Sequence, residues 1–120
     1  MRPDAPDWFW NAVDEIVNLL ALPAGWDSYG SPAISKAIAI SAMQLLGRVV
    51  SATIPRPDVI PTSAGGIAFE WSTLDHTLEV DILAPGRGHL YHEDLRTRAG
   101  DDLEFSDASV LEKFLATISR

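Results

Sequence analysis

Acidic residues recur at alternate positions in the middle of the chain, in a pattern that is typical of β-strands. Glu70 lies between Phe69 and Trp71, and Glu79 and Asp81 alternate with apolar residues a few positions later. Successive side chains of a strand point to opposite faces of a sheet, so these segments predict one apolar face and one acidic face. Carboxylates gathered on one face can bind a basic surface, or, as a close pair, take part in acid–base chemistry.

One antiparallel pairing that keeps the apolar residues in phase places Glu70 opposite Glu79. A shift of this pairing by two residues would keep the same faces and still leave Glu70 near Glu79 or Asp81. Like charges opposed across two strands destabilise a sheet, so their presence suggests a role other than stabilising the fold. Tyr91 and Glu93 extend the same face on the following strand. We expect this surface to bind a basic protein, in the manner of a phosphate-backbone mimic. The alternative is a face whose charges only keep the sheet hydrated and guard its edges.

The composition limits the classes of partner and of chemistry. The 120 residues contain 17 Asp and Glu against 9 Lys and Arg, which gives a net charge of −8. Such a chain is a poor direct ligand for nucleic acid or an anionic membrane, because phosphate contacts require clustered basic residues. The absence of cysteine excludes disulfides, thiolate metal sites and a cysteine nucleophile.

The sequence contains no strong catalytic motif. His89 and His92 are three residues apart, so on a strand they point to opposite faces and do not share a metal. A small metal-dependent hydrolase using His92, Glu93 and Asp81 is a second alternative. The chain contains neither a phosphate-binding glycine loop followed by Lys nor a serine nucleophile elbow. We therefore expect no enzyme, no cofactor and no metal.

Aromatic residues cluster near the N-terminus, where Trp8 and Trp10 flank Phe9. Neighbours on a helix cannot all lie on one buried face, so one tryptophan is expected to stay partly exposed. It would then anchor a partner or a second copy of the chain, which makes a structural homo-oligomer subunit the first alternative function. The other interpretation packs both tryptophans on the core beneath the loop that contains Trp26.

The first half of the chain reads as two helices. Asp7 is the expected N-cap of the first, and Pro23 and Gly25 end it. Ser35 is the expected N-cap of the second, which ends before a proline-rich link. The apolar stripes that predict these helices consist of Phe9, Val13, Ile16, Val17 and Leu20, then Ile38, Ala42, Leu45, Leu46 and Val49.

The second half reads as strands followed by a helix. The expected strands cover residues 59–60, 67–71, 78–82, 89–95 and 103–105. Prolines confine the first of these strands to a sheet edge, and residues 99–102 are expected to form a turn. Ser109 with Glu112 is a candidate capping box for the last helix, with Ser106 or Asp107 as an earlier cap. The fold class is α+β: one domain over residues 1–120, with two N-terminal helices, an antiparallel meander of four to five strands, and a C-terminal helix on one sheet face.

Three segments resemble a family of small uncharacterised bacterial and phage proteins. They are the GWDSYGSP loop within residues 22–32, the PDVIPT segment at 57–62 and the GGIAFEW strand at 65–71. The resemblance spans residues 22–83 and implies the same fold, but it brings no activity, cofactor or catalytic residue. Ser28 stands where the family often has glycine, which implies a stiffer turn here.

The sequence thus predicts a small acidic, non-catalytic binding protein that docks on a basic partner. Antitoxins, immunity proteins and phage-encoded inhibitors, including anti-CRISPR-like nucleic-acid mimics, are the classes that fit. The expected binding residues are Glu70, Glu79, Asp81, Tyr91 and Glu93, with Trp8 and Trp10 as an anchor for a partner or a homodimer. No targeting or membrane-spanning segment is evident, so we expect a cytoplasmic location.

Overall fold

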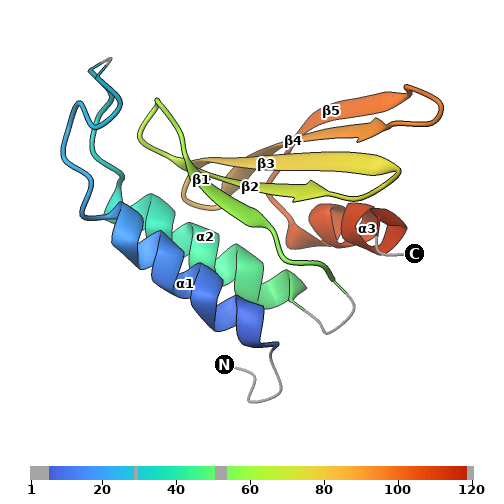
Figure 1. Cartoon of the computed structure of the whole chain (residues 1–120), viewed down its shortest axis with the longest axis horizontal. Helices are drawn as coiled ribbons and strands as arrows, with labels where there is room; N and C mark the ends of the chain where they lie inside the picture. The colour runs from blue at the N-terminus through green and yellow to red at the C-terminus, as the bar shows by residue number, and fades with distance from the viewer. Residues whose placement is uncertain (1–5, 29, 51–53, 119–120) are drawn as a thin grey trace.

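The computed structural model describes residues 6–28, 30–50 and 54–118, and it has the expected α+β architecture (Figure 1). Helices lie on one side of a five-stranded antiparallel sheet, and the strands follow one another in chain order. The elements are α1 (Asp7–Leu19), α2 (Lys36–Val49), β1 (Asp58–Pro61), β2 (Ile67–Ser72), β3 (His76–Ala84), β4 (Arg87–Asp94), β5 (Gly100–Phe105) and α3 (Ala108–Ile118).

The starts of the helices differ in how they are capped. Ser35 caps α2 as predicted, since its hydroxyl oxygen accepts a hydrogen bond from the backbone N–H of Ile38 at 3.4 Å. The prediction that Asp7 caps α1 is wrong, because Asp7 is already helical and Pro6, which cannot offer a side-chain acceptor, takes the cap position. The Asp7 carboxylate still lies in the first turn, where it complements the helix dipole. Val17 was expected in the buried stripe of α1 but is 48% exposed.

The turn that precedes β5 lies at other residues than the sequence predicted. Residues 99–102 do not form the turn, because β5 already begins at Gly100. The turn lies just before, where the Asp94 carboxylate accepts hydrogen bonds from the N–H groups of Arg96 at 2.9 Å and Thr97 at 3.2 Å. Arg98, rather than a glycine, takes the left-handed conformation that closes this turn, with φ of 64°.

Asp107 caps α3, and it is one of the two residues, Ser106 and Asp107, that the sequence offered as caps before Ser109. Its carboxylate oxygen accepts a hydrogen bond from the N–H of Ser109 at 2.9 Å. The capping box at Ser109 and Glu112 is therefore wrong, since Ser109 lies inside the helix that runs over residues 108–118.

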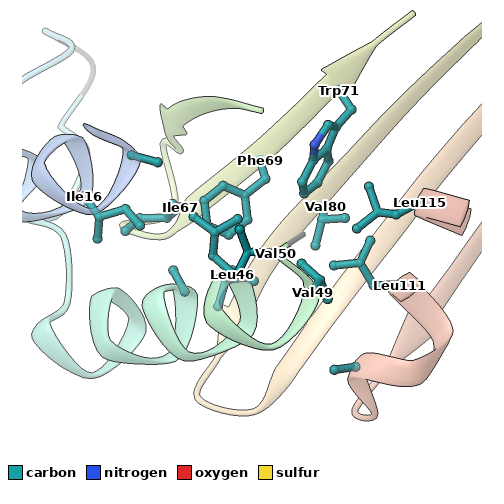
Figure 2. Packing of buried hydrophobic residues seen from close by; sticks show 14 of the residues in the cluster. Ile16, Leu46, Val49, Val50, Ile67, Phe69, Trp71, Val80, Leu111 and Leu115 are labelled. Carbon is teal, nitrogen blue, oxygen red and sulfur yellow. The ribbon is translucent and has the colours of Figure 1, made fainter. Parts of the chain in front are cut away.

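The core lies between the helices and one face of the sheet. Figure 2 shows Phe69, Trp71 and Val80 pointing from the strands toward the apolar side chains of α2 and α3. The Trp71 indole N–H donates to the carbonyl of Pro55 at 2.8 Å, so its only polar group is satisfied. The fully buried sheet residues are Ile67, Phe69, Trp71, Leu78, Val80 and Leu90, with Ile82 almost as buried.

Within the described part of the chain, no helix combines the length and the apolar character needed to cross a membrane.

Candidate functional site

The sheet register aligns acidic residues into a row that crosses all five strands. Asp58 pairs with Glu70, Glu70 with Glu79, Glu79 with Tyr91, and Tyr91 with Asp102. Directly paired residues of antiparallel strands project from the same face. The row lies on the face opposite the helices, because its neighbours along each strand fill the core.

We call this outer surface the acidic face. It includes a second line of paired residues, in which Asp81 lies opposite His89 and His89 lies opposite Glu104. Glu93 lies opposite Thr77 at one end. The members of the acidic face are Asp58, Glu70, Glu79, Asp81, His89, Tyr91, Glu93, Asp102 and Glu104. All five expected binding residues are thus brought together on one surface.

Glu70 pairs directly with Glu79, which is one of the registers that the sequence left open. The Thr73 N–H donates to the His76 carbonyl at 2.9 Å, which makes that pair a hydrogen-bonded one. Hydrogen-bonded and non-hydrogen-bonded pairs alternate along an antiparallel ladder, so Glu70 and Glu79 form a non-hydrogen-bonded pair. In such pairs the Cα atoms are about 4.5 Å apart and the side chains are closer than in hydrogen-bonded pairs. Glu70 and Glu79 are therefore direct cross-strand neighbours of like charge.

Two carboxyl groups of the acidic face, those of Glu79 and Asp81, have pKa values above their ordinary ones. Partial burial raises the pKa of Glu79, and the negative charges of Asp81 and Glu70 and a hydrogen bond to Asp81 raise it further. Partial burial also raises the pKa of Asp81, although its hydrogen bond with Glu79 and the nearby His89 act in the opposite direction. A hydrogen bond between two carboxyl groups requires one shared proton, so these two residues titrate as a pair.

Tyr91 lies in the middle of the acidic face and is 42% exposed. Its ring lies 4.4 Å from that of His89, centroid to centroid. Loss of hydration raises the pKa of the phenol, and the charges of Asp102, Asp81 and Glu79 raise it further, so the hydroxyl remains a hydrogen-bond donor. A hollow of about 550 Å³ lies beside it, between the carboxylates of Glu79 and Asp102 and their neighbours.

Basic residues neutralise the rim of the acidic face but not its centre. Arg98 pairs with Glu93 at 3.1 Å, and Arg87 approaches Glu104 at 3.5 Å. His89 contacts Asp102. Within the residues that the structure describes, no Lys or Arg forms an ion pair with the three central carboxylates, Glu70, Glu79 and Asp81. The centre of the surface thus has uncompensated negative charge.

The sequence prediction missed four members of this surface: Asp58, His89, Asp102 and Glu104. Asp102 was assigned to a turn, because Gly-Asp-Asp is a common turn sequence. The signal was the alternation of Asp102 and Glu104 with Leu103, which continues the predicted strand toward the N-terminus. Asp58 precedes the predicted edge strand by one residue and also continues its alternation.

His89 and His92 point to opposite faces, as the sequence predicted. His92 lies on the core side, where it bonds Asp101 at 3.0 Å and the Nδ1 atom of His76 at 3.0 Å. The hydrolase alternative placed His92 with Glu93 and Asp81, and the structure separates them across the sheet. Among the described residues, no group of three or more His, Asp or Glu side chains could hold a metal ion.

The two N-terminal tryptophans lie in different environments. Trp10 is 43% exposed, whereas Trp8 is half-buried against the core. Both rings contact Phe9 edge-on, with centroid distances of 5.2 Å for Trp10 and 6.4 Å for Trp8. The loop with Trp26 lies at the opposite end of α1 (Figure 1), so it does not cover this aromatic cluster.

That loop carries the motif behind the family resemblance. The Asp27 carboxylate accepts hydrogen bonds from the backbone N–H and the hydroxyl of Ser31, which closes the loop. Ser28 has φ of 67°, a conformation that glycine adopts without steric cost. Glycine would therefore be favoured over serine at that position on conformational grounds.

Comparisons of the chain with protein-family models, with curated proteins and with solved structures find no match. The class that the fold and the site define is therefore an α+β domain with an acidic outer sheet face, and the resemblance to the bacterial and phage family stays a prediction.

Proposed function

We propose that this protein is a non-catalytic binding protein whose acidic face docks on a basic protein partner. The observation that carries the proposal is the set of central carboxylates, Glu70, Glu79 and Asp81, which have no Lys or Arg partner among the described residues. Sheets tolerate such like-charge pairs at a cost in stability, and a cationic surface would remove that cost. The exposed Tyr91 in the middle adds the kind of aromatic side chain that is enriched in binding hot spots.

The chemistry of the partner follows from the shape and sign of the surface. The row that crosses the sheet has a carboxylate on four of its five strands and Tyr91 on β4, so it presents several negative charges side by side, as a phosphate backbone does. A protein that handles nucleic acid has a complementary basic surface. An antitoxin, an immunity protein or a phage-encoded inhibitor acting in the cytoplasm would use the acidic face in this way.

Affinity capture from host lysate tests the proposal. The native protein is compared with a variant carrying Glu70→Gln, Glu79→Gln and Asp81→Asn, which removes three charges from the centre of the acidic face. The control removes the same number of charges from exposed helical positions, with Asp7→Asn, Asp14→Asn and Glu112→Gln. We expect the native and control proteins to retain a basic partner that salt elutes, and the acidic-face variant to lose it.

Two results contradict this proposal. Equal retention by all three proteins would show that the partner binds elsewhere. Retention that increasing salt leaves unchanged would remove the electrostatic basis of the docking.

The raised pKa values of Glu79 and Asp81 add a dependence on pH. Below these pKa values the carboxyl groups hold protons and the face carries less negative charge. We therefore expect affinity for the captured partner to increase as the pH rises from 4.5 through the raised pKa values. Calorimetric titration at a series of pH values measures this increase, and the Glu79→Gln variant should show a smaller one.

A second candidate function is self-association through α1. Trp10 and Val17 are 43% and 48% exposed, and their spacing of two helical turns places them on the same side of the helix. Exposed apolar residues aligned in this way can form a homodimer interface. Sedimentation equilibrium of the native protein and of Trp10→Lys decides: a dimer that the substitution dissociates supports this function, and a monomer at high protein concentration excludes it.

A further inference from the structure

Strand β5 forms an open edge of the sheet. In the strand order β5 has β4 as its neighbour on one side, and Figure 1 shows it at the margin farthest from β1. Its pairing with β4 runs from Gly100 to Phe105 without a shift in register. A regular edge strand presents a row of backbone groups that can pair with a further strand.

The hydrogen-bond pattern identifies the backbone groups that point outward. The Asp94 N–H donates to the carbonyl of Ala99 at 2.8 Å, so this pair belongs to the hydrogen-bonded series between β4 and β5. Alternation along the ladder then directs the N–H and C=O groups of Gly100, Asp102 and Glu104 away from β4. Within residues 6–28, 30–50 and 54–118, the structure records no hydrogen bond to these outward backbone groups.

The pairing between β3 and β4 leads to the same directions for the backbone groups of β5. The Leu95 N–H donates to the carbonyl of Asp75 at 2.7 Å, which places Tyr91 and Glu79 in a hydrogen-bonded pair between β3 and β4. The backbone groups of Tyr91 therefore point toward β3. Asp102, which lies opposite Tyr91 on β5, consequently has its backbone groups directed to the open edge.

The side chains of β5 determine which strand could pair there. Asp102 and Glu104 project on the acidic face, whereas Leu103 and Phe105 are half-buried on the core side. Pairing with β5 of a second copy would bring acidic residues of the two strands together and is disfavoured. A strand that alternates basic with apolar residues fits this edge. Its basic side chains meet Asp102 and Glu104, where they replace or join the contacts of these carboxylates with His89 and Arg87. Its apolar side chains cover Leu103 and Phe105.

The other edge of the sheet lacks these properties. Strand β1 has only four residues, ends in Pro61 and follows the buried Pro57. Proline removes the backbone donors that an added strand requires. Of the two edges, β5 is the one suited to strand addition.

We infer that β5 binds an extended segment of the partner, with basic and apolar residues in alternation, as an additional strand of the sheet. The inference rests on the proposed function, because it names the part of a basic partner that docks beside the acidic face. Backbone hydrogen bonds to Gly100, Asp102 and Glu104 provide affinity, and the two carboxylates select basic side chains.

The direct test uses the peptide acetyl-Lys-Val-Lys-Val-Lys-Val-Lys-amide as the probe. NMR titration of the native protein should shift the amide signals of Gly100, Asp102 and Glu104, and their hydrogen exchange should slow. The same peptide with Glu in place of each Lys should leave these signals unchanged. This measurement requires no variant, so it does not depend on how well a substituted protein folds.

Matched variants separate the backbone contribution from the charge. Glu104→Ala removes the carboxylate, whereas Glu104→Pro removes the carboxylate and the outward N–H but no hydrogen bond to β4. Asp102→Ala and Asp102→Pro form the same comparison. We expect each proline variant to bind the Lys–Val peptide at least about fivefold more weakly than its alanine counterpart, the effect of one lost backbone hydrogen bond.

Equal affinity of the proline and alanine variants overturns the inference, as do peptide-induced shifts confined to β2 and β3. In either case the peptide would bind to the acidic face itself, and the proposed function would stand without strand addition. Conversely, protection of β5 combined with unchanged partner capture by the Glu70→Gln, Glu79→Gln, Asp81→Asn variant would remove the proposed function and keep the strand addition.

Discussion

The two faces of the sheet are built from the same strands but obey different constraints. On the core face, Phe69, Leu78 and Val80 are fully buried and pack against the helices. On the acidic face, Glu70 and Glu79 oppose each other with like charges, and partial burial together with the charges of Asp81 and Glu70 raises the pKa of Glu79. Packing explains every residue of the first set. We expect that the fold does not require the second set, because other polar side chains would also satisfy that surface.

The two faces therefore contribute differently to the stability of the domain. Apolar burial on the core face supplies the free energy that holds the domain together. The acidic face reduces that free energy through charge repulsion. An arrangement that costs stability and is not needed for folding is the feature from which binding is best inferred.

The largest expected effect comes from the core face. Phe69→Ala removes a fully buried ring and leaves a cavity, so it should lower the free energy of unfolding by about 3–5 kcal/mol. Its neighbour on the other face, changed as Glu70→Ala, should alter stability by less than about 1 kcal/mol. Urea denaturation of both variants measures the comparison. Similar losses at the two positions would mean that the acidic face is also structurally required.

The core face was predictable from the sequence because the buried residues of a strand occupy every second position. The alternation of Ile67, Phe69 and Trp71 with Ala68 and Glu70 predicted the strand and its buried face. It left open a register shift of two residues, which keeps the same faces, and the structure selects the register that pairs Phe69 with Val80. The chain order of the strands followed from the short turns between them. Helix starts were less predictable, since a cap depends on one residue: Ser35 was predicted correctly and Asp7 was not.

The second effect compares two histidines on one strand. His92 on the core side is 9% exposed and bonds both Asp101 and His76, so His92→Ala should cost about 1–3 kcal/mol. His89 on the acidic face is 22% exposed and contacts Asp102, and His89→Ala should cost about 0–1 kcal/mol. Thermal and urea unfolding of both variants give the ranking. The reverse ranking would contradict the assignment of the two side chains to their faces.

The acidic face was only half predictable. The sequence predicted the alternating acids of β2 and β3, but Asp102 and Glu104 joined them because the turn before β5 closes at Arg98 instead of Gly100. A glycine is the expected residue for that conformation, and the sequence offers one two residues later. The contact between His76 and His92 was not predictable either, since it depends on the register of β3 against β4.

The smallest expected effect is a gain in stability rather than a loss. Glu79→Gln removes the repulsion with Glu70 and Asp81, so it should raise the free energy of unfolding at neutral pH by about 0.2–1 kcal/mol. Glu112→Gln on the exposed surface of α3 serves as the control and should leave stability almost unchanged. Urea denaturation at neutral pH measures the difference between the two variants.

The pH dependence of that gain follows from the raised pKa of Glu79. The folded protein holds this proton more tightly than the unfolded chain, so folding is favoured while the group is protonated. As the pH rises from 4.5 through the raised pKa, the native protein loses this advantage and its free energy of unfolding falls. The glutamine variant lacks this loss, and the two stability curves should converge below pH 4.5 and separate above it. Curves that stay parallel over this range would show that the stability gain does not come from the ionisation of Glu79, and the contrast between the two faces would then lose its electrostatic basis.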